Sequence, residues 1–385
     1  MACRETPRTR AASACDIHSV GSSKWIDIVN QLCLCFRLEN YIDRVPVPMK
    51  NVLQSAPQDI LNAALCLRQD SVYSTQNGDA FLGDSQVLLS RLPTGSVNLV
   101  FTSPPYALHF KKEYGNADKR DYVKWFLPFA KEIFRVLRDD GSFVLNIGGS
   151  YNQGTPTRSL YHFHLMIALV EEIGFHLAQE CFWYNPAKMP MPAEWVTVRR
   201  IRIKDSVEYV WWFSKTPWPK ASNGKVLKEY SPDMIRLSKR GVKATVRPSG
   251  HVIRDSFDKI GAGGAIPSNV VEEGLSEDAP DAMLKFGNNA ANDDYARRSK
   301  ELGLKMHPAR FPASLPEFFI KMLTDAGDLV VDPFAGSNTT GVVAEGLQRR
   351  WIAFERVPEY LETSKVRFVP SDSEQKIEEL QTELF

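Results

Sequence analysis

The sequence of 385 residues lacks the features of a membrane, secreted or globally charged protein. Its longest apolar runs are far shorter than the roughly 20 residues that a membrane-spanning helix needs, so we expect no membrane association. Its six cysteines follow no regular spacing, which argues against a disulfide framework and for a reducing, cytoplasmic compartment. Its formal net charge is only +1, so attraction to a nucleic acid must come from a local patch. The length favours two lobes.

One apolar run ends in a stiff loop that offers hydrogen-bond acceptors. Residues 97–101 have the apolar, β-branched character of a buried strand, and Ser103, Pro104, Pro105 and Tyr106 follow closely. Two consecutive prolines neither donate to a sheet ladder nor continue a helix, so we expect an extended loop. The Ser103 hydroxyl and the Pro104 carbonyl can accept the two protons of an amine, while the Tyr106 ring stacks on a flat base. The alternative is a proline-stiffened turn without chemistry.

A second apolar run, residues 329–332, ends in a small-residue turn at Gly336 and leads into a helical pattern. A tight turn between a strand and a helix presents backbone N–H groups and the positive end of the helix dipole to a ligand. The next apolar run ends at Glu355, about 20 residues later, where an acidic side chain can take two ribose hydroxyls. The turn has one glycine where the dinucleotide fingerprint needs three. The alternative is an ordinary turn of a β-α-β unit.

These two stretches together resemble the amino-methylating DNA methyltransferases. That family uses S-adenosylmethionine and carries a (D/N/S)PP(Y/F/W) catalytic motif and a D-x-F-x-G cofactor motif, which match residues 103–106 and 332–336. The catalytic motif comes first, which is the circularly permuted order of the beta class. With serine in its first position, the catalytic motif resembles that of the cytosine-N4 branch. The middle of the chain is similar to the PvuII-type modification methylases. The resemblance covers about residues 75–368.

The resemblance implies an α/β, Rossmann-like fold of the S-adenosylmethionine-dependent methyltransferases, in circularly permuted order and with an inserted target-recognition lobe. The expected parts are an amino-terminal extension of unclear role (1–70), the catalytic half of the methyltransferase domain (71–185), the DNA target-recognition lobe and linker (186–304), the cofactor-binding half (305–368) and a tail (369–385). Apolar spacing predicts a strand, turn and helix over 78–92, helices over 121–137, 160–174 and 315–323, and a buried strand over 142–147 after a turn at 139–141.

The resemblance also implies roles for individual residues. Ser103, Pro104, Pro105 and Tyr106 would form the catalytic loop, and no metal is expected. The implied cofactor-binding residues are Asp84, His307, Pro308, Asp332, Phe334, Gly336, Ser337, Asn338, Thr339 and Glu355. For Asp84, a helix N-cap is an equally weighted interpretation that does not exclude a contact with the cofactor adenine. Asn338 stands where many relatives have glycine, and asparagine tolerates the left-handed backbone nearly as well.

The segment 186–250 is basic and aromatic. It holds 14 Lys or Arg against 5 Asp or Glu, interleaved with tryptophans. This composition is typical of a surface that follows the phosphates of DNA. We expect the tryptophans largely to pack, with residues 211–213 in a buried strand, and some of the cations to reach DNA. The expected DNA-binding residues are Lys111, Lys112, Arg199, Arg200, Arg202 and Lys204.

The function that the resemblance implies is transfer of a methyl group from S-adenosylmethionine to the N4 amine of a flipped-out cytosine in double-stranded DNA. The enzyme would be the modification part of a restriction-modification system, with a cognate endonuclease as a further partner. We expect a cytoplasmic, nucleoid-associated monomer, with a dimer as the alternative.

The sequence bears on other methylation reactions and on a non-catalytic DNA-binding role. Cytosine-C5 methylation needs a nucleophilic cysteine, typically after proline, and none of the six cysteines follows a proline. Adenine-N6 methylation by the same loop and a catalytically inactive DNA-binding relative stay open. A glutamine or RNA methyltransferase is less favoured because of the basic insert.

Overall fold

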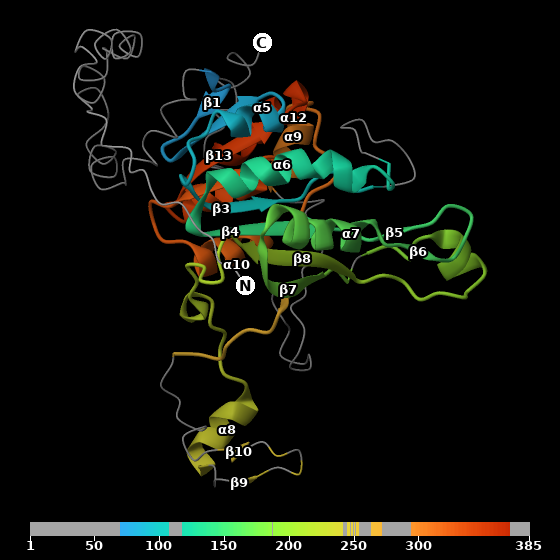
Figure 1. Ribbon diagram of the computed structural model, residues 1–385, viewed down its shortest axis with the longest axis vertical. Helices are drawn as coiled ribbons and strands as arrows, with labels where there is room; N and C mark the ends of the chain where they lie inside the picture. The colour runs from blue at the N-terminus through green and yellow to red at the C-terminus, as the bar shows by residue number, and fades with distance from the viewer. Residues whose placement is uncertain are drawn as a thin grey trace, which may run out of the picture. The chain divides into compact units, whose positions relative to one another are not determined.

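The computed structural model describes residues 70–107, 118–186, 188–241, 245–246, 248, 250, 252–253, 263–271 and 294–369. These residues build a nine-stranded mixed sheet with helices on both faces (Figure 1). Predictions for Lys111, Lys112, residues 1–69, the part of the predicted lobe and linker within 272–293 and the tail from 370 lie outside the described residues.

The spatial order of the strands is β1-β2-β13-β12-β3-β4-β8-β7-β11. β2, β13, β12, β3 and β4 are parallel to one another, and β8 is antiparallel to both of its neighbours. The α/β class expected from the sequence is therefore confirmed. The strands of this sheet are β1 (Tyr73–Ser74), β2 (Gly78–Leu82), β3 (Val97–Thr102), β4 (Leu137–Ile147), β7 (His176–Tyr184), β8 (Val207–Ser214), β11 (Val270–Val271), β12 (Leu329–Asp332) and β13 (Arg350–Glu355).

Two short hairpins and the helices complete the described chain. The hairpins are β5 (Ser150–Tyr151) with β6 (Arg158–Ser159), and β9 (Thr245–Val246) with β10 (Val252–Ile253). The α-helices are α5 (Ser85–Ser90), α6 (Tyr122–Val136), α7 (Tyr161–Ala168), α8 (Pro232–Arg240), α9 (Asp294–Glu301), α10 (Ser314–Leu323), α11 (Thr339–Gly346) and α12 (Pro358–Ser364). The single turns of other helix types are η3 (Leu169–Ile173), η4 (Glu194–Val198), η5 (Asn223–Lys225) and η8 (Lys365–Phe368).

Most of the predicted elements are confirmed, and one turn is wrong. β2 with α5, then α6, α7 with η3, and α10 occupy the stretches in which the sequence predicted them. Asp139, Asp140 and Gly141, predicted as a turn before a strand, lie inside β4. The pairing of β3 with β4 jumps from Leu137 to Ser142, so the polar residues form an irregularity in a continuous strand instead of ending it.

The expected boundary between residues 185 and 186 does not coincide with a break in the sheet. β8, which the sequence placed in the recognition lobe, pairs with β4 and β7 and belongs to the catalytic sheet. Its apolar run at 211–213 is buried, as predicted. The sequence could not reveal this membership, because composition marks a basic segment but not the long-range pairing of one strand within it.

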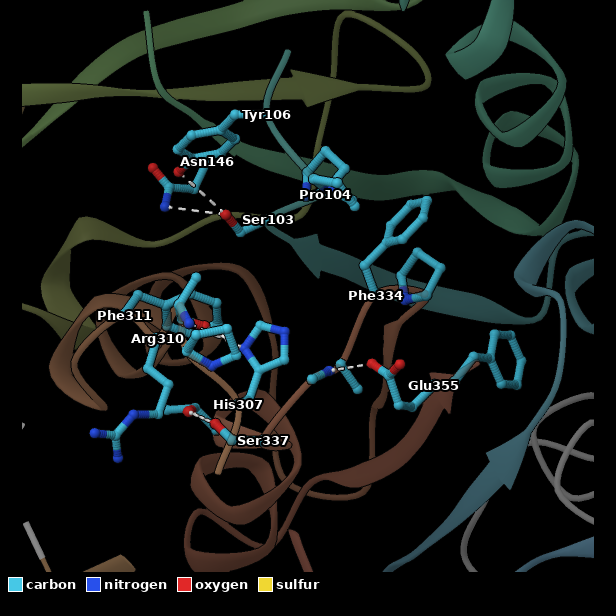
Figure 2. A pocket seen from close by; sticks show the side chains of 18 of the residues that line it. Ser103, Pro104, Tyr106, Asn146, His307, Arg310, Phe311, Phe334, Ser337 and Glu355 are labelled. Atoms are coloured by element: carbon cyan, nitrogen blue, oxygen red, sulfur yellow. Dashed lines mark hydrogen bonds between the residues drawn. The ribbon is translucent and has the colours of Figure 1, made fainter. Parts of the chain in front are cut away.

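The carboxyl ends of the parallel strands meet at one edge of the sheet, where open α/β sheets bind their ligands. The loop after β3 carries Ser103 and the loop after β12 carries Gly336, and these two strands are adjacent. Figure 2 shows that residues from both loops point into one pocket. The strand order thus brings together two motifs that are more than 200 residues apart in the chain.

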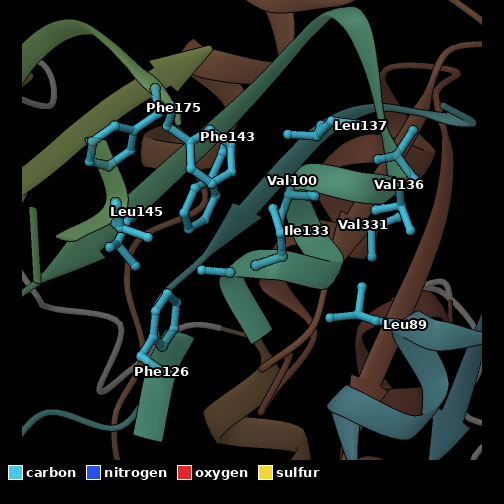
Figure 3. Close-up of a cluster of buried hydrophobic side chains, with 14 of the residues drawn as sticks. Leu89, Val100, Phe126, Ile133, Val136, Leu137, Phe143, Leu145, Phe175 and Val331 are labelled. Atoms are coloured by element: carbon cyan, nitrogen blue, oxygen red, sulfur yellow. The ribbon is translucent and has the colours of Figure 1, made fainter. Parts of the chain in front are cut away.

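Apolar side chains on both faces of the sheet hold these strand ends in place. In β3, Val100 packs on one face with α5, α6 and α7, while Leu99 and Phe101 pack on the other face against α10 and α11. Figure 3 shows Val100 and Val331 of neighbouring strands among Leu89, Ile133 and the aromatic rings of the first face. Because successive residues of a central strand are buried on opposite faces, the register of the strand is strongly fixed.

Candidate active site

A cavity of about 310 Å³ opens at the carboxyl edge of the sheet, which is within the range of small-molecule sites. All four predicted catalytic residues line it, and Figure 2 shows Ser103, Pro104 and Tyr106 on one side of the pocket. Seven of the ten predicted cofactor-binding residues line it as well: His307, Pro308, Phe334, Gly336, Ser337, Thr339 and Glu355.

The catalytic loop is fixed by hydrogen bonds from helix and strand. The Tyr122 hydroxyl of α6 donates to the Pro105 carbonyl at 2.8 Å. The Asn146 Nδ2 atom, near the end of β4, donates to Ser103 Oγ at 3.4 Å, and the oxygen atoms of Ser103 and Tyr106 are 3.2 Å apart. Ser103 therefore stands between an amide donor and a phenol, as Figure 2 shows.

The Tyr106 ring is placed by a glycine and by a carboxylate. A Cβ atom at Gly148 would lie 2.6 Å from the ring, so the ring occupies space that only glycine leaves free. The Tyr106 hydroxyl donates to Glu208 Oε2 of β8 at 2.8 Å. Burial, with the negative charge of Glu208 beside it, raises the pKa of Tyr106 well above its usual value. The phenol is therefore protonated at neutral pH and acts as a donor to Glu208.

Asp332 ties the two loop-bearing strands together. Its Oδ1 atom accepts from the Thr102 hydroxyl at 2.6 Å and from the Phe334 N–H, and its Oδ2 atom accepts from the Thr340 hydroxyl at 2.6 Å. The side chain is buried and is absent from the lining of the cavity. Burial raises its pKa to about 6 despite these three donors. These contacts give Asp332 a structural role, because they join β3 to the turn after β12 and to the start of α11, while the cofactor contact of Asp332 stays a prediction.

The turn at Gly336 has the tight geometry that the sequence predicted. Gly336 has φ +53°, and a Cβ atom there would lie 3.2 Å from the His307 ring. Its N–H donates to Glu355 Oε2 at 2.9 Å, and Glu355 Oε1 accepts from the N–H groups of residues 356 and 357. Glu355 is 7% exposed, and burial raises its pKa. Burial also lowers the pKa of His307 to about 4, so that its imidazole is neutral near pH 7.

Asp84 and Asn338 cap helices and do not line the cavity. Asp84 Oδ1 accepts from the N–H of Gln86 at 2.9 Å, which is the N-cap alternative that the sequence left open; the next residue, Ser85, lines the cavity instead. Asn338 adopts the left-handed conformation, with φ +52°, and its Oδ1 accepts from the Gly341 N–H at 3.0 Å. The sequence correctly predicted that asparagine would be tolerated there.

Among the lining residues that sequence reasoning missed, Asn146 and Glu208 contact the predicted catalytic residues. Asn146 is 1% exposed, and an amide side chain inside the predicted buried strand 142–147 was an available signal. Its Oδ1 atom makes no hydrogen bond within the described part of the chain. Glu208 directly precedes the apolar run of β8. It reaches Tyr106 only because β8 pairs with β4 in the register that places Tyr209 opposite Ile147. No local sequence pattern reveals that pairing.

The predicted DNA-binding cations that the structure describes lie in the loop between β7 and β8. Arg199, Arg200, Arg202 and Lys204 are all exposed. Arg199 pairs with Glu194 at 2.6 Å and stacks 5.1 Å from the Trp195 ring centroid. Arg202 donates to the Pro156 carbonyl of the β5–β6 hairpin. Large apolar side chains of the same loop are exposed as well: Met189, Met191, Val198, Ile201 and Ile203.

No group of His, Cys, Asp or Glu side chains within the described ranges could hold a metal ion. Among the same residues, no helix is both long and apolar enough to cross a membrane.

A family model described as DNA methylase, covering N6 and N4 methylases, matches residues 97–366. Among characterised relatives, the type II methyltransferase M.PvuII of Proteus hauseri is 47% identical over 334 residues, which are 86% of this chain and 94% of the relative. The type II methyltransferase M.BglII of Bacillus subtilis is 25% identical over 284 residues, which are 73% of this chain and 66% of the relative.

A solved structure agrees with these sequence matches. The PvuII DNA methyltransferase, described as cytosine-N4-specific, superposes with a TM-score of 0.64 and 44% sequence identity. The match covers 82% of this chain and 95% of that one. The family match over residues 97–366 spans both the loop after β3 and the turn after β12.

Proposed function

The chain belongs to the N6/N4 DNA methylase family, and from this membership we propose that it methylates the N4 amine of cytosine in double-stranded DNA. The methyl donor is S-adenosylmethionine. The observation that carries the proposal is the position of Ser103 in the cavity, beside Tyr106 and opposite the turn at Gly336. Transfer of a methyl group between two bound molecules needs both sites in one pocket: a hydrogen-bond acceptor that holds the amine and a turn that binds the methyl donor.

The residues on the cofactor side fit S-adenosylmethionine. The turn at Gly336 leaves space that a Cβ atom would fill, and the Glu355 carboxylate lies in the same cavity wall with backbone N–H groups on both oxygens. A carboxylate has about four acceptor sites, so one remains for a ribose hydroxyl beyond these three donors. Phe334 and Phe311 offer apolar faces to a flat adenine. When bound, the cofactor supplies a methyl group on a positively charged sulfur.

The residues on the base side fit an amine. The lone pair of cytosine N4 is delocalised into the ring, which makes the amine a poor nucleophile. Hydrogen bonds from its two protons to Ser103 Oγ and the Pro104 carbonyl favour a pyramidal nitrogen and free that lone pair. The nitrogen then attacks the methyl carbon in line, becomes positively charged and loses a proton. Most of the catalysis is positioning in a pocket that excludes water.

The exposed loop between β7 and β8 supplies the DNA contact in this proposal. Its four cations are of the kind that bind phosphates, and its exposed apolar side chains are of the kind that occupy gaps in a deformed duplex. The base must be flipped out of the duplex to reach Ser103, at a cost of a few kcal/mol. We place the target-recognition function in this loop and in the segment after β8, within the range 186–304.

The biological setting in this proposal follows from the relatives. M.PvuII is named a type II methyltransferase, which supports a role in a restriction-modification system with a cognate endonuclease that acts on the same site. A cytoplasmic, nucleoid-associated monomer fits that role.

Methylated nucleosides test the proposal. The protein is incubated with unmethylated DNA and S-adenosylmethionine, and the digested DNA is analysed by mass spectrometry. N4-methylcytosine is the expected product. N6-methyladenine would overturn the choice of base, and unmethylated DNA despite cofactor and DNA binding would favour a non-catalytic DNA-binding protein.

A further inference from the structure

An unbroken chain of polar contacts leads from the catalytic serine to the DNA-facing loop. Ser103 Oγ is 3.2 Å from Tyr106 Oη, and Tyr106 Oη is 2.8 Å from Glu208 Oε2. The other carboxylate oxygen, Glu208 Oε1, is 3.2 Å from Nζ of Lys188, which follows β7 at the start of the loop. The proposed methyl transfer uses Ser103, but it assigns no role to Glu208 or Lys188.

The direction of each hydrogen bond in this chain can be worked out from the donors available. An ionised carboxylate only accepts, so the single proton of Tyr106 points to Glu208. Tyr106 can then only accept from Ser103, so the Ser103 proton points to Tyr106. One lone pair of Ser103 Oγ accepts from Asn146, and the other remains for a ligand. With Glu208 charged, Ser103 is thus held as an acceptor, which is the role that an amine substrate requires.

We propose that Glu208 is a positioning residue that orients the Ser103 hydroxyl through Tyr106 and receives the proton that the methylated amine releases. The inference deepens the proposed function and rests on it. The chemistry needs such an acceptor, because the amine nitrogen gains a bond to carbon and must lose a proton to become neutral.

The relay balances in atoms and charge. The nitrogen–proton bond of the methylated, positively charged amine breaks, and that proton bonds to Ser103 Oγ. Ser103 gives its own proton to Tyr106 Oη, and Tyr106 gives its proton to Glu208 Oε2. Ser103 and Tyr106 end neutral and unchanged, and Glu208 ends as a neutral carboxylic acid. Burial holds the pKa of Tyr106 high, so no free tyrosinate forms and the two inner transfers occur together.

The surroundings of Glu208 suit it to the end of such a relay. Its side chain is 13% exposed, which is enough contact with solvent to release the proton after turnover. The Lys188 ammonium, 28% exposed, compensates the carboxylate while Glu208 is ionised. Because Lys188 belongs to the loop that carries the DNA-facing cations, a displacement of that loop on DNA binding would reach Glu208 directly.

A kinetic test uses the full-length chain, unmethylated DNA and labelled S-adenosylmethionine, with enzyme in excess so that one round of methyl transfer is observed. Glu208→Gln keeps the shape and an oxygen that accepts from Tyr106 but removes the charge and the basicity. We expect its transfer rate to fall roughly 10- to 100-fold, with dissociation constants for cofactor and DNA within about twofold of the wild type. Glu180→Gln, an exposed site on neighbouring β7, is the matched control and should leave the rate unchanged.

A double-mutant comparison separates a relay from independent effects. Tyr106→Phe breaks the same chain at its middle, so Tyr106→Phe with Glu208→Gln should be no slower than the slower single variant. A Glu208→Gln rate near wild type, a loss confined to the dissociation constants, or multiplying effects in the double variant would each overturn the relay. A wild-type protein that methylates no DNA would instead overturn the proposed function, and this inference with it.

Discussion

At the scale of single residues, the site is defined by what each side chain can accept or leave open. In our proposal, Ser103 accepts from an amine because its own proton is directed to Tyr106; the Tyr106 ring fits beside the strand end because residue 148 is glycine. On the other side of the cavity, Gly336 allows both the left-handed turn and the close approach of the His307 ring. Small increases in side-chain size at residues 148 and 336 should therefore have large effects on ligand binding.

Gly336→Ala should weaken cofactor binding at least about 10-fold. The added Cβ would be 3.2 Å from the His307 ring, on a backbone with φ +53° that side chains rarely adopt. Isothermal titration with S-adenosylmethionine measures the effect. Gly346→Ala, where a Cβ meets nothing within 4 Å, is the matched control and should bind as the wild type does. Equal affinity of the two variants would show that the turn does not contact the cofactor.

Sequence reasoning reached the residues of the site whose signal is local. The proline pair after a buried strand and the glycine turn before a helix identified Ser103 and Gly336, because backbone constraints act over a few residues. The same reasoning missed Glu208 and did not predict that Asp332 joins two strand ends. Both roles depend on hydrogen-bond partners, Tyr106 for Glu208 and Thr102 for Asp332, which are distant in sequence.

At the scale of elements, Asp332 joins the ends of β3 and β12. Thr102 of β3 and Thr340 of α11 both donate to its buried carboxylate. The two loops that line the cavity are therefore coupled through one ionisable group. Since burial raises the pKa of this group, the coupling also has a pH dependence.

The stability difference between the wild type and Asp332→Asn should decrease as pH rises from 4 to 7. The folded pKa of Asp332 is about 6, above the usual 3.8, so the folded wild type binds more protons than the unfolded chain between these values. The free energy of unfolding of the wild type therefore falls across this window, by on the order of 3 kcal/mol for this group. The variant does not titrate at this position. Urea unfolding at several pH values measures the difference, and a difference that rises with pH would contradict the raised pKa.

The elements themselves were largely predictable, and the exceptions have a common cause. Strongly periodic segments such as α6 and α10 were placed correctly, because burying one face of a helix requires that spacing. The polar residues 139–141 resemble a turn, but β3 pairs with Leu137 before them and with Ser142 after them, so they form an irregularity inside β4. Long-range pairing overrides a local signal in that case.

At the scale of the whole molecule, a net charge of +1 gives no general attraction to DNA. The exposed cations of the loop between β7 and β8 therefore carry the electrostatic part of binding in our proposal. Such an arrangement confines the duplex to the side of the protein where the loop lies.

Replacing Arg199, Arg200, Arg202 and Lys204 together with glutamine should weaken DNA binding and flatten its salt dependence. Each lost phosphate contact removes about 0.9 from the slope of log affinity against log salt. We expect the slope to fall by about 2 to 4, with cofactor affinity unchanged, in fluorescence anisotropy titrations at several salt concentrations. Replacing Lys124 and Lys131, two exposed lysines of α6, serves as the control. An unchanged slope in the fourfold variant would place the DNA elsewhere.

The proposed function depends most on Ser103, whose Oγ accepts a hydrogen bond from the cytosine amine during methyl transfer. The most direct test compares wild type and Ser103→Ala by mass spectrometry of nucleosides from unmethylated DNA incubated with S-adenosylmethionine. The account predicts N4-methylcytosine from the wild type and at least about 100-fold less from Ser103→Ala, at equal cofactor affinity. Methylation by Ser103→Ala at the wild-type rate, or no methylated cytosine from the wild type, would contradict it.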